Sequence, residues 1–202
     1  DYSIDKTDTS SPVVTPLSTT TYIVTVTDAN NCSASDDVVV IVNPLPIANA
    51  GNDVNICLNQ SYQLNASGGV SYSWTPDKFL SSNIINNPIA TPTSSITYYL
   101  TVTDNNGCSA SDDIVISLPY AFAGEDKSIC LGDSITIKAS GGIKYLWNNG
   151  ANTNYITVAP NKVNDYTYYI VMATDTFGCT AFDSIRIFVY DNPQIFIGND
   201  TS

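Results

Sequence analysis

Three segments of this chain repeat one pattern, and its clearest copy is YYLTVTDNNGCSASDDIVIS at residues 98–117. The other copies are YIVTVTDANNCSASDDVVV at residues 22–40 and YYIVMATDTFGCTAFD at residues 168–183. In each copy, β-branched or aromatic residues alternate with polar ones on both sides of a short break that starts at Asp and ends at Cys. Alternation around turn-forming residues predicts two antiparallel strands joined by a tight turn. Each repeated unit therefore ends in a β-hairpin.

A second pattern precedes the hairpin and gives the length of the repeat. AGNDVNIC at residues 50–57 and LNASGGVSYSW at residues 64–74 recur as AGEDKSIC at residues 123–130 and IKASGGIKYLW at residues 137–147. The differences 130−57 and 147−74 are both 73. A unit of this size is near the lower limit for independent folding, since folding removes only about 60% of its surface from water. We expect an array in which neighbours or covalent bonds add stability.

The second unit divides into short strands at the spacing of a β-sandwich. The predicted strands cover residues 47–50, 53–57, 61–66, 70–75, 83–90, 96–103 and 111–118. Trp74 and Trp147 stand where immunoglobulin-like domains keep a buried Trp. A tyrosine corner is expected near the start of the penultimate strand, at Tyr22, at Tyr98 or Tyr99, and at Tyr168. The fold class is therefore all-β, with tandem immunoglobulin-like sandwiches, although such aromatic residues also fit the core of any other sandwich.

The repeat divides the chain into four segments. Residues 1–46 are expected to be the C-terminal half of one unit with its Pro-rich linker, and residues 47–119 and 120–194 to be complete units. Residues 195–202 repeat the start of a unit, through Gly198 and the two residues after it. Because residue 1 falls inside a repeat, we expect this sequence to be a piece of a longer array.

Composition excludes several classes of function. The chain has 19 acidic and 7 basic residues, a net charge of −12, and no His. This charge repels nucleic acid and anionic lipid, so no nucleic-acid partner is expected. No segment approaches the roughly 20 apolar residues of a membrane helix, so no membrane insertion is expected in this segment. The chain lacks the commonest general base and metal ligand, which argues against an enzyme.

These phrases resemble a known family. GNDVNICLNQSYQLNASGGVSYSWTP and NPIATPTSSITYYLTVTDNNGCSASDDIVISL, with their copies, resemble the PKD-like, immunoglobulin-like repeats of large secreted Bacteroidota surface proteins. Such repeats occur in gliding-motility adhesins of the SprB type, which leave the cell through type IX secretion, and also between catalytic modules of secreted hydrolases. The resemblance covers essentially the whole chain. It implies an extracellular location on the bacterial cell surface.

Five cysteines occupy two positions of the repeat: Cys57 and Cys130 at the front, and Cys32, Cys108 and Cys179 after the hairpin turn. The expected disulfides lie within a unit, Cys57 to Cys108 and Cys130 to Cys179, with Cys32 unpaired. Closing the 51 residues between Cys57 and Cys108 would stabilise a unit by about 4 kcal/mol. In an ideal immunoglobulin topology, however, these two turns lie at opposite poles, farther apart than a disulfide spans. The alternative is a bond between neighbouring units, from Cys57 to Cys179.

Two further kinds of site are candidates. Asp53, Asp104, Asp126 and Asp175 are weak candidates for Ca²⁺ ligands, since Ca²⁺ takes six to eight oxygen ligands. Asp is also a standard turn former, and neither an EF-hand nor a nonapeptide calcium pattern is present, so no cofactor is expected. The resemblance to Bacteroidota proteins implies O-glycosylation in Asp-Ser-apolar sequences, which places candidate sites at Ser134 and Ser184.

Three functions are weighed on these observations. The first is a structural stalk or filament segment of a secreted adhesin, whose partners are the neighbouring repeats and, beyond them, surface polysaccharide or other adhesin chains. The second is a carbohydrate-binding or spacer module of a secreted polysaccharide-degrading enzyme, with Tyr72, Phe79 and Tyr155 as exposed aromatic contacts. The third, an enzyme, needs paired carboxylates across a cleft, and accidental Asp pairs in turns do not establish one.

Overall fold

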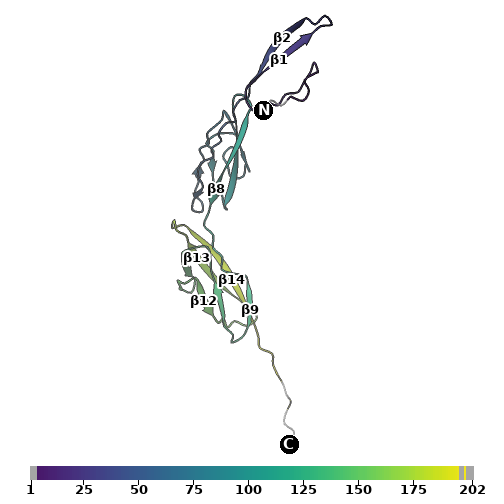
Figure 1. Ribbon diagram of the computed structural model, residues 1–202. Helices are drawn as coiled ribbons and strands as arrows, with labels where there is room; N and C mark the ends of the chain where they lie inside the picture. The colour runs from purple at the N-terminus through teal and green to yellow at the C-terminus, as the bar shows by residue number, and fades with distance from the viewer. Residues whose placement is uncertain (1–3, 196–197, 199–202) are drawn as a thin grey trace.

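The computed structural model describes residues 4–195 and 198. The described part contains strands, turns and loops but no helix, and two tandem immunoglobulin-like β-sandwiches follow one another end to end along an extended molecule (Figure 1). A search of these residues for a membrane-spanning helix finds none. The all-β fold class predicted from the sequence is confirmed.

The chain begins with a hairpin of β1 (Thr20–Thr27) and β2 (Ser33–Val40), which are antiparallel. Before it, a single bridge joins Ile4 to Val14. Apolar side chains of the hairpin are exposed where those of the next unit are buried: Val26 is 66% exposed, whereas Val102 at the same repeat position is 0% exposed. Among the described residues, no second sheet covers this hairpin.

The first sandwich consists of six strands in two sheets. The strands are β3 (Val54–Asn55), β4 (Tyr62–Gln63), β5 (Ser71–Thr75), β6 (Ile89–Ala90), β7 (Ile96–Thr103) and β8 (Ser109–Ser117). One sheet has the order β3-β8-β7-β5, and the other pairs β4 with β6. β3 and β8 are parallel, with Val54 opposite Ile116, whereas the other neighbours are antiparallel. The first and last strands of the unit therefore lie side by side.

The second sandwich repeats this topology. Its strands are β9 (Lys127–Cys130), β10 (Ile135–Lys138), β11 (Lys144–Trp147), β12 (Tyr155–Val158), β13 (Tyr166–Thr174) and β14 (Thr180–Tyr190). The sheets have the orders β11-β13-β14-β9 and β10-β12, and β9 is parallel to β14. Here the parallel pairing is longer, from Ile187 opposite Lys127 to Tyr190 opposite Cys130.

Each sandwich has its own core around one Trp. Trp74 and Trp147 are buried as predicted, and each indole Nε1 donates to a backbone carbonyl, that of Ile85 or Thr153, at 2.9 Å. Inward residues alternate along the strands with outward ones, for example in β7, where Tyr98, Leu100 and Val102 are all buried. This period of two follows from the pleat, which turns successive side chains to opposite faces.

The expected tyrosine of the first sandwich, Tyr98, is buried, but its hydroxyl donates to the Lys78 carbonyl at 2.9 Å, twenty residues upstream, and not to a backbone group a few residues upstream as in a tyrosine corner. In the second sandwich the expected residue, Tyr168, is wrong, because Tyr168 points outward and is exposed. Tyr169 packs against the core instead. The reason is register: Tyr98 is ten residues before Cys108, and Tyr169 is ten residues before Cys179.

Strand existence was predicted better than strand length. The hairpin strands were placed within a few residues, whereas the predicted strand at 47–50 is reduced to one bridge, Asn49 to Ser67, and the strand predicted at 83–90 to Ile89–Ala90. The expected division into segments 1–46, 47–119, 120–194 and 195–202 stays a prediction. Most of the last segment, residues 196–197 and 199–202, lies outside the described residues.

Candidate functional site

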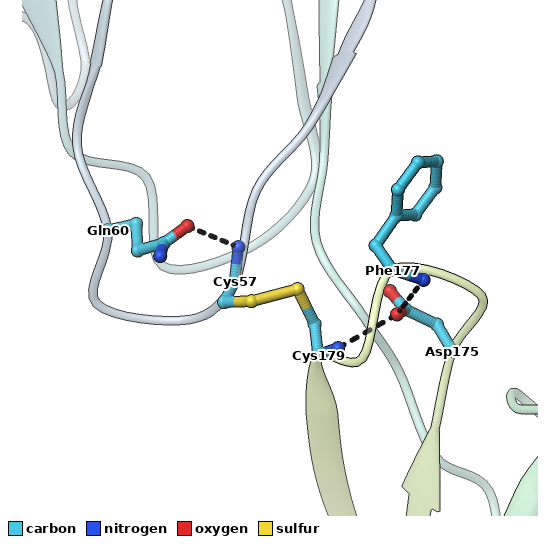
Figure 2. The surroundings of a disulfide bond; sticks show 5 residues. All are labelled: Cys57, Gln60, Asp175, Phe177 and Cys179. Carbon is cyan, nitrogen blue, oxygen red and sulfur yellow. Dashed lines mark hydrogen bonds between the residues drawn. A yellow bond between two sulfur atoms is a disulfide. The ribbon is translucent and has the colours of Figure 1, made fainter.

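A disulfide between Cys57 and Cys179 joins the two sandwiches (Figure 2). The two Cα atoms are 5.1 Å apart, within the usual range for a disulfide, and the bond spans 122 positions of sequence. The expected pairs within units, Cys57 to Cys108 and Cys130 to Cys179, are therefore wrong. The pairing found is the alternative, a bond between neighbouring units.

The strand topology explains this pairing. Because β3 runs parallel to β8, Cys57 lies at the end of the first sandwich where β8 ends, and the Ile56 amide donates to the Ser117 carbonyl at 3.0 Å. Cys108 precedes β8 and so lies at the opposite end of the same sandwich. Cys179 precedes β14 and lies at the near end of the second sandwich. The bond thus forms between the only two cysteines that meet at this joint.

A tight turn holds Cys57. The backbone amide of Gln60 donates to the Cys57 carbonyl at 3.1 Å. The Cys57 amide donates back to the Gln60 side-chain oxygen, Oε1, at 3.0 Å (Figure 2). Asn59 adopts a φ of 67°, a left-handed conformation that Asn tolerates better than most residues. The turn therefore fixes the backbone of Cys57 from both sides.

The β13–β14 hairpin presents Cys179 in a similarly fixed way. Asp175 Oδ1 accepts from the amides of Phe177 and Cys179 at 2.8 and 2.9 Å (Figure 2). The Asp175 amide in turn donates to the Cys179 carbonyl at 2.9 Å. A carboxylate that accepts two backbone N–H groups makes charge-assisted hydrogen bonds, which are stronger than neutral ones. The conserved spacing from Asp to Cys in the repeat therefore serves to shape the turn that carries the cysteine.

The disulfide is joined by few polar contacts at the joint between the sandwiches. Among the described residues, no hydrogen bond or ion pair runs from residues 47–117 to residues 121–190. The linker itself is anchored, since the Leu118 amide donates to Ser95 Oγ at 2.9 Å. A cleft of about 720 Å³ lies at the joint, and the residues around it are Cys57–Asn59, Thr93–Ser95, Leu118–Ala121 and Gly178–Phe182. Within the part of the chain that the structure describes, the units are thus joined by one short linker and one covalent cross-link, without hydrogen bonds or ion pairs between them.

Repeated Asp residues clamp the first strand of each unit to its last. In the first sandwich, Asp112 Oδ2 accepts from the Ala50 amide and Asp53 Oδ1 accepts from the Val115 amide, both at 2.8 Å. In the second sandwich the equivalent bonds run from Ala123 to Asp183 and from Arg186 to Asp126. Each unit is therefore closed by carboxylates at the two strands where the chain enters and leaves.

Asp126, the residue before β9, makes a further contact, an ion pair with Arg186 of β14. Two hydrogen bonds from Arg186, first from its backbone amide and then from its guanidinium, hold the pKa of the Asp126 carboxyl below its usual value. The same pair raises the pKa of the Arg186 guanidinium. The effect belongs to an exposed pair, so solvent screens it.

The calcium candidates all have structural partners. Asp53 and Asp126 accept from the last strand of their units, and Asp104 and Asp175 accept from the amides of their hairpin turns. In residues 4–195, no group of three acidic or Cys side chains is placed to hold a metal ion. The candidates therefore do not converge, and their carboxylates act as turn and strand clamps.

The remaining candidate residues lie at separate places. Cys32 and Cys130 are exposed free thiols, and Cys108 is a half-buried one. Ser134 is exposed in the turn between β9 and β10, and Ser184 is exposed on the outer face of β14. Both hydroxyls are accessible to a modifying enzyme, and glycosylation at these positions stays a prediction.

The aromatic residues proposed for carbohydrate do not form one surface. Tyr72 is half-buried and donates from its hydroxyl to the Gly69 carbonyl, whereas Phe79 packs against the Lys78 ammonium. Tyr155 is exposed. Sequence reasoning missed a different row on the outer face of β13 and β14, where Phe188 stacks edge to face with Tyr166 and Tyr190.

This aromatic row belongs to the second sandwich alone. Tyr166, Tyr168 and Phe188 occupy the repeat positions of Ser95, Thr97 and Ser117 in the first. The sequence contains this difference, and a residue-by-residue alignment of the outward positions of the two hairpins would have found it.

Comparison with known proteins assigns the chain to no family. No family model matches the chain, and no curated protein matches it. Among solved structures, DIP-gamma IG1+IG2 covers 73% of this chain and 98% of its own, with 11% identity and a TM-score of 0.39. The match to the human Desmocollin-1 ectodomain covers 96% of this chain and 50% of that one, with 13% identity and a TM-score of 0.42. The match to Drosophila N-cadherin EC1-4 covers 87% of this chain and 59% of that one, with 14% identity and a TM-score of 0.32.

Proposed function

We propose that this chain is a load-bearing stalk segment of a secreted bacterial cell-surface adhesin, of the type found in gliding motility and exported by type IX secretion. The observation that carries the proposal is the Cys57–Cys179 bond between two otherwise loosely connected sandwiches. A bond at the joint between units adds nothing to a ligand site within a unit. It does fix the geometry and the mechanical continuity of a rod.

The bond gives force a short covalent path through both units. The chain enters the first sandwich, runs along β3 to Cys57, crosses to Cys179, and runs along β14 to the far end of the second sandwich. Residues 58–178, which number 178−57 = 121, lie outside this path. Pulling on the two ends of the oxidised chain therefore cannot extend residues 58–178.

Reduction of the disulfide changes which contacts carry the force. Once the disulfide is reduced, the force enters each unit at its first strand and leaves at its last, and because β3 is parallel to β8 and β9 is parallel to β14, these strands slide along each other when the ends are pulled apart. The ladder hydrogen bonds and the Asp clamps then bear the load together. This is a shear geometry, in which several bonds must break at once.

Single-molecule force spectroscopy tests the proposal. The chain is held by its two ends and stretched in oxidising buffer and again in a thiol reductant. We expect the fully stretched length to increase on reduction by about 400 Å, because 121 residues at about 3.4 Å each become extensible. An equal stretched length in both buffers would refute a load-bearing joint.

A matched pair of variants controls this experiment. Cys57→Ser removes the bond and should show the long extension in both buffers, whereas Cys130→Ser leaves it intact and should behave as the unchanged chain. If Cys57→Ser shows the short extension, a contact other than the disulfide carries the load.

The chemistry of the chain fits this location. A structural disulfide is typical of proteins that fold in an oxidising compartment, such as the periplasm or the cell exterior. The net charge of −12 keeps neighbouring rods apart and soluble. We also propose O-glycosylation at Ser134 and Ser184, which are exposed, and intact mass of the natively isolated protein would detect it.

A second candidate function is carbohydrate binding, with the chain as a module of a secreted polysaccharide-degrading enzyme. The observation that favours it is the outer face of β13 and β14, where Tyr166, Tyr168 and Tyr190 are all exposed. Exposed apolar patches on soluble proteins commonly mark interaction sites. Isothermal titration with bacterial surface polysaccharide tests it: Tyr168→Ser should abolish binding, and Tyr99→Ser on the first sandwich should leave it unchanged.

A further inference from the structure

The three free cysteines occupy the same repeat positions as the two bonded ones. Cys130 stands 73 residues after Cys57, at the front of the next unit, and Cys32 and Cys108 stand in hairpin turns equivalent to that of Cys179. The Cys57–Cys179 bond therefore joins one cysteine of each class, across one joint. Each free cysteine belongs to one of the same two classes.

The hairpin turns have the same geometry whether or not the cysteine is bonded. In all three turns the Asp amide donates to the Cys carbonyl at 2.9 Å, and the Asp carboxylate accepts from the Cys amide at 2.8 to 2.9 Å. The residue before the cysteine has a positive φ in each: 66° at Asn31, 81° at Gly107 and 83° at Gly178. Cys108 is thus already presented in the way that Cys179 is.

The front turns match as well. The Gln60 amide donates to the Cys57 carbonyl at 3.1 Å, and the Asp133 amide donates to the Cys130 carbonyl at 3.1 Å. The third residue of each turn has a positive φ, 67° at Asn59 and 95° at Gly132. Cys130 is therefore held in the backbone arrangement of a bonded cysteine, yet its thiol is exposed.

The position of Cys130 along the molecule also matches. It ends β9 opposite Tyr190, where β14 ends, so it lies at the end from which the chain leaves the second sandwich. Between the end of β8 and Ala121, where the next unit starts, lie three residues, 118–120. Between the end of β14 and residue 195, the equivalent start in the sequence repeat, lie four residues, 191–194. A following unit at this end therefore meets Cys130 through a linker of nearly the same free length.

We propose that Cys130 binds the hairpin cysteine of an adjoining unit of this same repeat, and that Cys108 binds the front cysteine of the unit on its other side. In each bond two thiols lose two protons and two electrons, and a disulfide oxidant such as oxidised glutathione takes them up to become two thiols. Every joint of the array then carries one disulfide. Each complete unit carries two, one at each end.

This inference rests on the proposed stalk function and extends it. Consecutive bonds overlap along the sequence, because Cys57–Cys179 encloses both Cys108 and Cys130. The array is then a continuous covalent chain in which no unit lies outside a closed loop. Breaking one bond releases the joint that it crosses, while its neighbours still hold the units on either side.

The test is an extended chain in which residues 1–194 are followed directly by a second copy of residues 121–202. The added copy carries Thr180→Ser and Ser134→Thr, two exposed positions, so that its cysteine peptides differ in mass from those of the first copy. The chain is oxidised in a glutathione redox buffer, the free thiols are alkylated, and disulfide-linked peptides are identified by mass spectrometry.

We expect Cys130 of the first copy to be linked to the marked hairpin peptide, beside an intact Cys57–Cys179 link. Cys130→Ser in the first copy should remove only the first of these links. If Cys130 of the first copy is alkylated, or is linked within its own unit, while the Cys57–Cys179 link has formed, the inference is wrong and the stalk proposal stands. If the Cys57–Cys179 link is absent as well, both are wrong.

Discussion

At the scale of single residues, the two sandwiches differ at the inward tyrosine of the penultimate strand. Tyr98 donates its hydroxyl to the Lys78 carbonyl at 2.9 Å, and burial raises the pKa of its phenol. Tyr169 occupies the same repeat position and is also desolvated, but no hydrogen bond from its hydroxyl is found within the described residues. The hydroxyl of this inward tyrosine is thus hydrogen-bonded in one unit of the two.

We therefore expect Tyr98→Phe to lower the free energy of unfolding of the first sandwich by about 1 kcal/mol, the usual value of one hydrogen bond. Tyr169→Phe is the matched control and should change the second sandwich much less. Each sandwich contains one Trp, so urea unfolding followed by NMR of the two indole N–H signals reports each unit separately in the unchanged background. Equal losses in both units would contradict the assignment.

Asp126 gives a prediction about pH. Because its pKa is lowered in the folded chain, its contribution to stability is present above the unfolded value, near 3.9, and is lost as pH falls through the lower folded value. An NMR titration should place the Asp126 pKa below 3.8. Arg186→Gln should raise the pKa only partly, since the backbone amide of residue 186, the largest cause, remains. A full return to 3.8 would show that the guanidinium alone is responsible.

At the scale of elements, the closure of each sandwich depends on a few polar contacts between its first and last strands. β3 contains only Val54 and Asn55, too short to be held by its own ladder. The bond from the Ala50 amide to Asp112 and the bond from the Val115 amide to Asp53 supply the remaining contacts. A short first strand is therefore kept in place by side chains of β8 and of the segment before it.

We expect Asp112→Ala to destabilise the first sandwich by about 1.5 to 3 kcal/mol, because the Ala50 amide loses a charged acceptor. Asp113→Ala is the matched control: Asp113 is the next residue, its side chain is exposed, and its removal should change the free energy of unfolding little. Urea unfolding of the first sandwich measures both. A similar effect from the two substitutions would show that charge, and not the hydrogen bond, is what counts.

The Gly-Gly turn before the Trp strand is set by close approach of the backbone. A Cβ on Gly141 would lie 2.3 Å from the Tyr120 carbonyl oxygen, and its φ is +104°. Gly150 also has a positive φ, +86°, but open space around it. Gly141→Ala should therefore destabilise the second sandwich by well over the roughly 1 kcal/mol expected for Gly150→Ala. Thermal unfolding of the two variants separates the destabilisation caused by the steric clash at residue 141 from that caused by a positive φ alone.

At the scale of the whole molecule, the joint is the place where stability and mechanics meet. If the second sandwich unfolds while the first stays folded, the chain from Leu118 to Cys179 becomes a closed loop of 179−117 = 62 residues. In the chain-entropy account this closure stabilises the folded unit by up to about 4 kcal/mol. A bond outside the core of either sandwich thus supports the second one.

Reduction of the chain should accordingly lower the free energy of unfolding of the second sandwich, by up to about 4 kcal/mol, as measured by urea unfolding of the Trp147 signal. Cys130→Ser, in oxidising buffer, should leave that signal unchanged. Small-angle X-ray scattering on the same samples should show a broader range of shapes after reduction, because only the linker of residues 118–120 then connects the units. An unchanged scattering profile would mean that other contacts hold the joint.

The sequence by itself determined the period of 73 residues, the hairpins, the buried Trp residues and the all-β class, because these follow from local alternation and turn chemistry. It did not determine which cysteines pair. Cys57 and Cys108 share a unit and are closer in sequence than Cys57 and Cys179, yet they lie at opposite ends of the sandwich. Only the tertiary structure decided the pairing, because the parallel arrangement of first and last strands fixes which turns face which neighbour.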